Sequence, residues 1–206
     1  MNKIVTFTQR VDVIPSYNER RDCADQRIAR FIYECGYIPV PLPNDFTLAL
    51  CAVRVLKPCG IILTGGNSLE KYGGNAQERD KTEYELISYA IKNNIHLYGF
   101  CRGMQVILDY FGQPLESVTN HVATRHKLIS PIWQNREVNS YHNQGIYCKN
   151  FKSENLQIMA YTDDGVVEAI RHTQFNIKAT MWHPEREEIF NPNDIRFVQD
   201  LFGGKE

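Results

Sequence analysis

The stretch "LYGFCRGMQVI", from Leu97 to Ile107, joins an apolar, strand-like run to a helix-like run through a single cysteine. Gly99 and Gly103 flank Cys101 two residues away on each side, which is the G-x-nucleophile-x-G form of a nucleophile elbow. Such a turn lifts the nucleophile above the sheet edge, and the N-terminus of the following helix favours its thiolate. The alternative is a buried structural cysteine in an ordinary tight turn, and the pentapeptide alone does not decide between them.

Strand-like and helix-like segments alternate on both sides of this turn. Strands of this length separated by helices are typical of parallel βαβ units with helices on both faces of the sheet. The segment "YIPVPLP", with proline at alternate positions, suits an edge strand. The expected strands are 3–8, 37–43, 59–66 and 95–100, and the expected helices are Arg21–Cys35, Phe46–Leu56, Glu78–Asn93 and a segment from Met104 to Phe111.

The pattern changes after Leu115. The segments "HKLIS", "REVNSY", "LQIMAYT", "GVVEAIRH" and "IKATMW" are short and rich in β-formers, and a last helix is expected over Pro192–Phe202. We therefore predict a single domain over residues 1–206. Its predicted class is α/β: an open, mostly parallel sheet with helices on both faces and an added antiparallel section.

Composition narrows the possible partners. The chain has 206 residues and a formal net charge of -1, which gives no reason to expect binding to nucleic acid or to an acidic membrane. No apolar run approaches the about 20 residues that cross a bilayer, and the N-terminus lacks the apolar core of a signal peptide. The six cysteines form no CxxC pair, so we expect neither disulfides nor a zinc site. Free cysteines are typical of a reducing compartment, so we expect a cytoplasmic location.

A thiolate nucleophile needs a base that can also protonate the leaving group. Of the six histidines, His183 has the most suitable context, "MWHPERE". In extended chain Glu185 projects to the same side as His183, so its carboxylate can fix the imidazole tautomer. The alternative for "HPE" is a surface turn after a strand, but its pairing with the elbow favours the catalytic interpretation.

An oxyanion hole would complete such a site. The backbone N–H of Arg102, the residue after the cysteine, is one natural donor, and the glycines of "LTGGNS" allow a second, for which we choose Gly66. "TGG" could equally be an ordinary turn or a weak phosphate loop. It lacks the lysine and the spacing of a P-loop, which disfavours nucleotide hydrolysis.

In their order along the chain, "GGNS", "GFCRGMQ", "VNSYHNQGI", "DGVVEAI" and "MWHPE" resemble the class I glutamine amidotransferases. The chain is most similar to their stand-alone γ-glutamyl hydrolase branch, and the likeness spans nearly its whole length. The resemblance implies a flavodoxin-like fold without metal or organic cofactor. It makes Cys101 the nucleophile, His183 the base and Glu185 its orienting partner, with Gly66 and Arg102 as oxyanion donors. Arg102 departs from the apolar residue common in ammonia-channelling members.

The resemblance also implies a pocket for the glutamyl group. Gln105 matches a position that holds the α-amino and α-carboxylate end, and "SYHNQ" falls where the family uses mostly backbone groups. The implied pocket residues are Gln105, Tyr141, Asn143 and Gln144, with His142 as a further candidate.

Several other side chains have weaker cases. His121 and His126 either line the site or are exposed, whereas His96 and His172 are expected to be structural. Arg20 and Arg21 belong to a charged stretch that we interpret as a solvated helix start, with contact to an anionic leaving group as the alternative.

Three functions fit these observations. The first is a self-sufficient hydrolase that cleaves a small γ-glutamyl amide through a glutamyl thioester on Cys101. The second is a glutaminase that passes ammonia to a separate synthetase, because this chain has no room for a synthetase domain. The third is a catalytically silent binding module, against which the three catalytic residue types argue. The sequence leaves open the amine that is released, a metabolic partner enzyme and a homo-oligomer.

Overall fold

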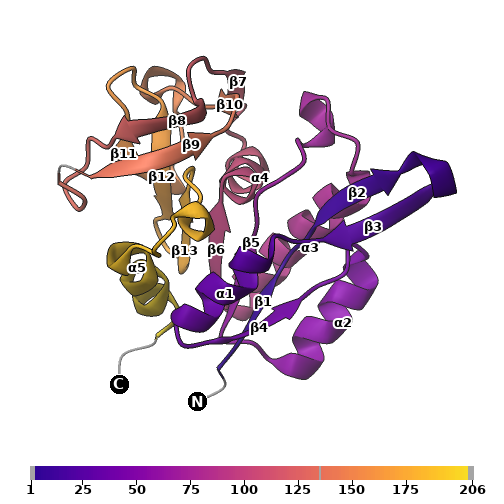
Figure 1. Cartoon of the computed structure of the whole chain (residues 1–206). Coiled ribbons are helices and arrows are strands. Elements are labelled where there is room, and N and C mark those ends of the chain that lie inside the picture. The colour runs from indigo at the N-terminus through magenta and orange to yellow at the C-terminus, as the bar shows by residue number, and fades with distance from the viewer. Residues whose placement is uncertain (1–2, 135, 204–206) are drawn as a thin grey trace.

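The computed structural model describes residues 3–134 and 136–203, and its centre is a seven-stranded sheet with the order β11-β12-β13-β6-β5-β1-β4 (Figure 1). The strands from β4 to β13 run parallel, whereas β12 and β11 are antiparallel to their neighbours. The mostly parallel sheet with an antiparallel section is therefore confirmed. The strands are β1 (Ile4–Phe7), β4 (Ile38–Pro41), β5 (Gly60–Leu63), β6 (His96–Phe100), β11 (Leu156–Tyr161), β12 (Val167–His172) and β13 (Ile177–Thr180).

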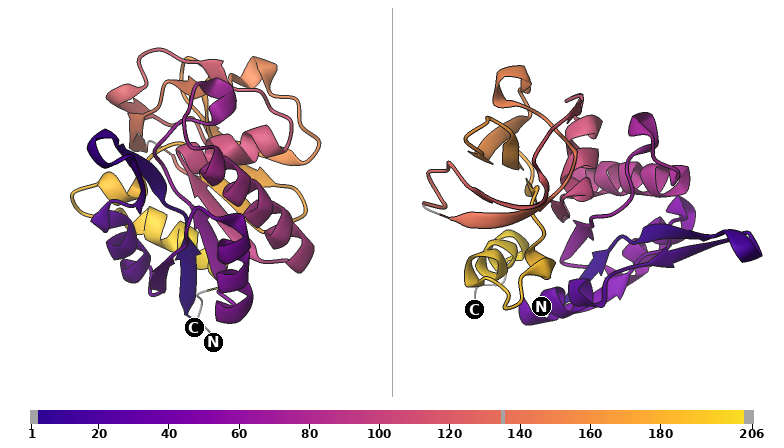
Figure 2. Two further views of the ribbon diagram at one scale, coloured as in Figure 1. Left: turned by 90° about the vertical axis from the view of Figure 1, so that its right-hand side faces the viewer. Right: turned by 45° about the horizontal axis from the view of Figure 1, so that its top comes forward.

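Helices cover both faces of this sheet, as Figure 2 shows from two further directions. Alternate residues of the central strands supply the two cores: Ile62 and Tyr98 face one side, whereas Ile61 and Leu97 face the other. The first side packs against α1 (Gln26–Glu34) and α5 (Pro192–Phe202), and the second against α2 (Phe46–Leu56), α3 (Gln77–Asn93) and α4 (Arg102–Tyr110). Strands buried on both faces explain the continuous apolar runs of the sequence.

The edge position predicted for the proline-containing strand is confirmed. β4 pairs only with β1 in the sheet order, so Pro39 and Pro41 lie on an edge strand. Proline cannot donate a ladder hydrogen bond, and this position tolerates that loss.

The predicted helix Arg21–Cys35 is wrong in its first part. Residues 10–23 form a hairpin of β2 (Arg10–Ile14) and β3 (Glu19–Cys23), joined by the 3₁₀ turn η1 (Pro15–Tyr17), and the helix begins only at Gln26. The Asp25 side chain caps that helix by accepting from the N–H of Arg27. The charged residues of this stretch are exposed on a two-stranded ribbon, so they show no apolar alternation that would have revealed a strand.

The second half adds a small β section beside the main sheet. β8 (Val122–Lys127) pairs with β9 (Glu137–Tyr141), and the short β7 (Glu116–Ser117) pairs with β10 (Gln144–Gly145). Three further 3₁₀ turns are η2 (Glu70–Tyr72), η3 (Cys148–Asn150) and η4 (Pro184–Arg186). All six cysteines are free. Over the described part of the chain, no helix combines the length and the apolar character that crossing a membrane requires.

Candidate active site

Cys101 occupies the sharp turn between β6 and α4. Its φ of 50° and ψ of -109° lie outside the regions that a non-glycine residue normally adopts. The flanking glycines are required by close approach of the backbone. A Cβ on Gly99 would lie 2.6 Å from the carbonyl oxygen of Gly103, and a Cβ on Gly103 would lie 2.0 Å from that of Leu63. The predicted strand–cysteine–helix elbow is therefore present.

His183 lies against this cysteine at the end of the neighbouring strand β13. The two side chains line the same cavity, and Nδ1 of His183 lies 2.7 Å from Oε1 of Glu185. We expected an extended link between His183 and Glu185. Instead, Pro184 starts the 3₁₀ turn η4, which folds the carboxylate back toward the imidazole. The fold thus brings the three predicted catalytic side chains together, all of them buried.

The surroundings of His183 favour its charged form. Burial alone would lower the pKa of this imidazole, but the contacts with Cys101 and Glu185 outweigh burial and raise its pKa to about 10. An opposite charge nearby favours ionisation, so the contacts with Cys101 and Glu185 favour the imidazolium form of His183 at neutral pH. An imidazolium in this place can serve as a proton donor.

Asn139, a residue that the sequence analysis did not single out, fixes the main chain of His183. Its side-chain oxygen accepts from the N–H of His183 at 2.9 Å, and its amide donates to the carbonyl of His183 at 2.8 Å. Asn139 is buried on β9, so this pair of hydrogen bonds joins the added β section to the segment that follows β13. The sequence offered one signal for this role, an asparagine within the β-rich segment "REVNSY", because a buried asparagine side chain needs hydrogen-bond partners.

The loop with the predicted oxyanion donor Gly66 is also held from behind. The Arg79 guanidinium donates to the carbonyls of Thr64 at 2.7 Å, Gly65 at 3.1 Å and Gly66. The carbonyl of Gly65 and the N–H of Gly66 belong to one trans peptide and point in opposite directions. Arg79 therefore turns the N–H of Gly66 away from itself. A Cβ on Gly65 would lie 2.7 Å from Cε1 of His183, so only glycine fits this contact.

The Arg102 side chain points away from the cavity into the same buried network. Its guanidinium forms ion pairs with Glu83 and Asp80, and it is 1% exposed. Glu83 also accepts from Arg79 at 3.0 Å and from Thr8 at 2.7 Å. One carboxylate thus connects the residue after the cysteine with the arginine behind the glycine loop. The i,i+4 pair in "RDKTE" was a sequence signal for this network.

Burial and charge oppose each other in this network. Burial and the neighbouring Arg102 lower the pKa of Arg79 to about 10, which leaves it charged at neutral pH. Burial raises the pKa of Glu83, but Arg102 and Arg79 outweigh it and hold that pKa below its usual value. The network is therefore ionised, and its paired charges fix the two loops that flank Cys101.

A cavity of about 280 Å³ opens beside Cys101 and contains every residue that we predicted for the glutamyl pocket. Gln105 donates to the carbonyl of Gln144 at 3.0 Å, which ties α4 to the opposite wall. The lining residues are Gly66, Asn67, Ser68, Cys101, Gln105, Tyr141, His142, Asn143, Gln144, His183 and Arg186.

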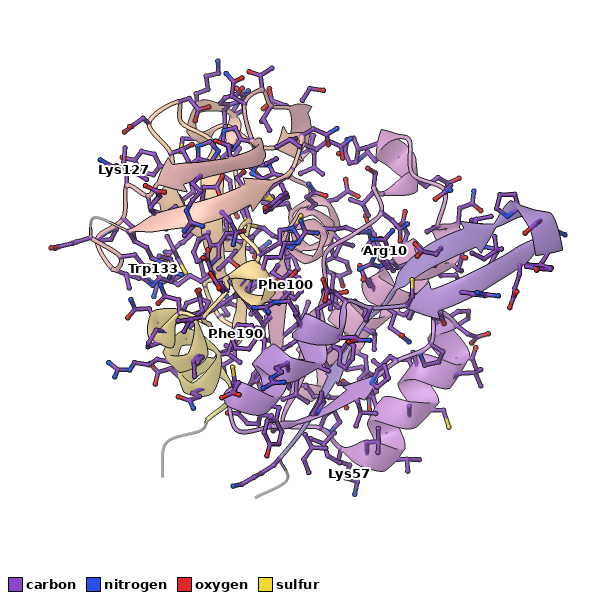
Figure 3. All side chains as sticks on the ribbon, in the orientation of Figure 1. Arg10, Lys57, Phe100, Lys127, Trp133 and Phe190 are labelled. Atoms are coloured by element: carbon purple, nitrogen blue, oxygen red, sulfur yellow. The ribbon has the colours of Figure 1, made fainter. Side chains whose placement is uncertain are left out.

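A second cavity, also of about 280 Å³, shares Gly66 and His183 with the first and is lined as well by Arg10. Arg10 is labelled at the start of β2 in Figure 3. The charged side chains at this cavity include Arg10, Asp12, Asp25 and Arg186. Two cavities that share Gly66, His183 and Arg186 suit an extended substrate with its reacting bond between them.

The remaining candidates fall outside both cavities. Arg20 and Arg21 both lie on the exposed hairpin, where Arg20 donates to Glu78 and Arg21 donates to Glu19. Neither arginine lines either of the two cavities, so the alternative of a contact with the leaving group is not supported. His172, the last residue of β12, accepts hydrogen bonds from the N–H groups of Gln174 and Phe175, which is the structural role that we expected. His121 and His126 stack on each other at 4.1 Å between ring centroids, behind the first cavity rather than in it.

Comparison with known proteins agrees with this architecture. The chain has the fold of a class I glutamine amidotransferase, and it belongs to the Peptidase C26 family, whose model matches residues 4–185. It is 29% identical to the γ-glutamyl-CDP-amidate hydrolase of Campylobacter jejuni, over 96% of each chain. It is 28% identical to a glutamine-hydrolysing GMP synthase chain of Methanosphaera stadtmanae, over 78% of this chain and 82% of that protein.

A solved structure shows the same fold at lower identity. A Thermoplasma acidophilum protein assigned to the same kind of GMP synthase chain superposes with a TM-score of 0.72 and 17% identity, covering 98% of this chain and 94% of the other. Together, the family and these relatives support a hydrolase that acts on glutamine or on a γ-glutamyl amide.

Proposed function

We propose that this protein hydrolyses the γ-glutamyl amide bond of a small γ-glutamyl conjugate, releasing glutamate and a free amine. The observation that carries the proposal is the contact of Cys101 with His183, itself bonded to Glu185 at 2.7 Å, at the boundary of two cavities. The glutamyl group would occupy the cavity lined by Gln105 and Gln144, and the amine would lie in the other.

The reaction then proceeds in two halves. The Cys101 thiolate attacks the δ-carbonyl carbon, and the N–H groups of Gly66 and Arg102 stabilise the oxyanion. His183 gives its proton to the departing amine, the C–N bond breaks, and a glutamyl thioester remains on Cys101. His183, now neutral, takes a proton from water, the resulting hydroxide attacks the thioester, and the C–S bond breaks. Glutamate leaves, and the thiolate–imidazolium pair is restored.

A γ-glutamyl-linked cytidine diphosphate amidate is our first candidate for the substrate. The similarity to the Campylobacter jejuni hydrolase over 96% of both chains supports this choice. The second cavity supports it as well, because Arg10 and Arg186 line it and can meet phosphate oxygens.

Glutamate release from a panel of γ-glutamyl amines, with and without phosphate groups, tests the proposal. We expect turnover without ATP or a partner protein, and a higher kcat/KM for one substituted amine than for glutamine. Contacts to a larger leaving group can be used to stabilise the transition state, which is the reason for this preference. If every conjugate stays intact and glutamine is cleaved only after a synthetase is added, the protein is an ammonia-supplying glutaminase instead.

A further inference from the structure

Three buried side chains behind the first cavity form a triangle of ligand atoms. His121 precedes β8, His142 follows β9, and Glu168 lies on β12. Nδ1 of His121 lies 3.2 Å from Nε2 of His142, which in turn lies 3.2 Å from Oε1 of Glu168. The third edge, from His121 Nδ1 to Glu168 Oε1, is 3.4 Å. The two histidines are 21 residues apart and Glu168 is 26 residues beyond His142, so no close spacing reveals the group in the sequence.

Hydrogen bonds cannot satisfy all three edges of this triangle. The other ring nitrogen of each histidine faces an acceptor: His121 Nε2 lies 3.0 Å from Asp164 Oδ2, and His142 Nδ1 lies 3.1 Å from the carbonyl of Gln144. Those nitrogens therefore carry the protons of the neutral rings. Lone pairs of His121, His142 and Glu168 then converge with no hydrogen between them. Such convergence of acceptors requires positive charge at its centre.

The dimensions fit a tetrahedral metal ion. Zinc binds imidazole nitrogen and carboxylate oxygen at about 2.0–2.2 Å, which in a tetrahedron sets the ligand atoms about 3.3–3.6 Å apart. The edge of 3.4 Å lies within this range, and the two edges of 3.2 Å lie just below it. Metal-bound histidines typically donate their second N–H to a carboxylate or a backbone carbonyl, as His121 and His142 do here. We propose that His121, His142 and Glu168 bind a divalent transition-metal ion of the zinc type.

Charges around the triangle agree with a cation. Among the described residues, Oε2 of the fully buried Glu168 has no hydrogen-bond partner. The metal-free alternative is one added proton on the inner nitrogen of His121 or of His142, whose N–H would then donate to Oε1 of Glu168.

The ion would hold a wall of the glutamyl cavity in place. His142 lines that cavity, and the carbonyl of Gln144 accepts from both His142 and Gln105. A metal bound to His142 and to Glu168 therefore fastens this wall to β12. The ion would position this wall rather than react with the substrate, because neither His121 nor Glu168 lines the cavity of Cys101, and this role goes beyond the proposed hydrolysis.

Cobalt titration of the whole, chelator-stripped chain tests the site without any measurement of hydrolysis. We expect one equivalent of Co²⁺ to give the visible d–d bands of a four-coordinate ion and to be displaced by one equivalent of Zn²⁺. Glu168→Gln should abolish this binding. Asp164→Asn, at a half-exposed carboxylate outside the triangle, should raise Kd about 10–100-fold. His96→Gln serves as the control, because His96 begins β6 and Cys101 follows the other end of that strand. This variant should bind Co²⁺ as tightly as the wild type does.

Absence of one-equivalent binding by the wild-type chain would overturn the proposal in favour of a protonated histidine. Binding that is equally tight in Glu168→Gln and Asp164→Asn would overturn it as well, since the ion would then lie elsewhere. If Glu168→Gln does not fold, Asp164→Asn decides the question, because the surface position of that carboxylate spares the core.

Discussion

The side chain of Asn139 forms two hydrogen bonds with the main chain of His183: it accepts from the N–H at 2.9 Å and donates to the carbonyl at 2.8 Å. Asn139 lies on β9 and His183 in the segment between β13 and η4, so this double hydrogen bond sets the position of the imidazole relative to Cys101. Removing it should displace the imidazole while leaving the nucleophile in its turn.

Asn139→Ala should therefore lower kcat about 100-fold, because small misplacement of a catalytic group costs about that factor. KM should change much less, since the glutamyl cavity does not include Asn139. Steady-state kinetics of Asn139→Ala beside the exposed control Asn93→Ala checks this. A wild-type kcat in a stably folded Asn139→Ala would show that the double hydrogen bond has no catalytic consequence.

Arg79→Lys tests the support behind the glycine loop. Lysine keeps the charge but cannot reach the carbonyls of Thr64, Gly65 and Gly66 with one planar fork. Loss of one oxyanion donor costs about 100–1000-fold in kcat, and we expect about 10–100-fold for a donor that is misaimed rather than removed. Arg54→Lys, on the exposed surface of α2, serves as the control. An unchanged kcat with a lowered melting temperature would reduce Arg79 to a purely structural role.

The pH profile reports the raised pKa of His183. A folded pKa of about 10, above the ordinary 6.5, means that the imidazolium persists at neutral pH and is lost only as pH rises toward 10. Its stabilising contribution is likewise complete below pH 6.5 and disappears through the same alkaline range. The alkaline limb of kcat/KM should thus move to lower pH in Glu185→Gln, which lacks the carboxylate charge. Glu188→Gln should keep the wild-type limb, and an unmoved limb in Glu185→Gln would refute the coupling.

Gly103→Ala tests the geometry of the elbow. The added Cβ would lie 2.0 Å from the carbonyl oxygen of Leu63, so the start of α4 must shift and carry Cys101 with it. Alkylation of Cys101 should slow about 100-fold. Gly112→Ala has open space around its Cβ but a φ of 73°, so it should cost about 1–2 kcal/mol of stability and leave alkylation unchanged. Equal alkylation rates in the two variants would contradict the requirement for glycine at 103.

The sequence predicts the central sheet well because buried parallel strands are short apolar runs between helices. The helices Phe46–Leu56 and Pro192–Phe202 have the bounds in the structure that their sequence pattern predicts. The hairpin of β2 and β3 escapes prediction because its strands are stabilised by pairing with each other, not by an apolar face. Its charged residues come directly before the apolar helical pattern of α1, so in the sequence they resemble a solvated start of that helix.

The same distinction between local and long-range contacts applies to the candidate site. Cys101 and His183 lie in short motifs whose chemistry is local, so residue type and spacing are enough to propose them. Three further residues act through contacts outside their own motifs: Asn139 bonds to His183, Arg79 donates to the carbonyl of Gly65, and Glu83 accepts from Thr8. Only the fold brings those partners together, and no single stretch of sequence contains both members of each pair.

The central claim is that Cys101 is the nucleophile that takes the glutamyl group. Treatment with a diazoketone that mimics glutamine, followed by peptide mapping, tests it most directly. The account predicts one equivalent of label on Cys101, none on the other five cysteines, and about wild-type folding with no labelling and no turnover in Cys101→Ser. His183→Asn should slow the labelling by orders of magnitude, whereas His96→Asn should not. Stoichiometric label on any other cysteine, or full turnover by Cys101→Ser, would contradict the account.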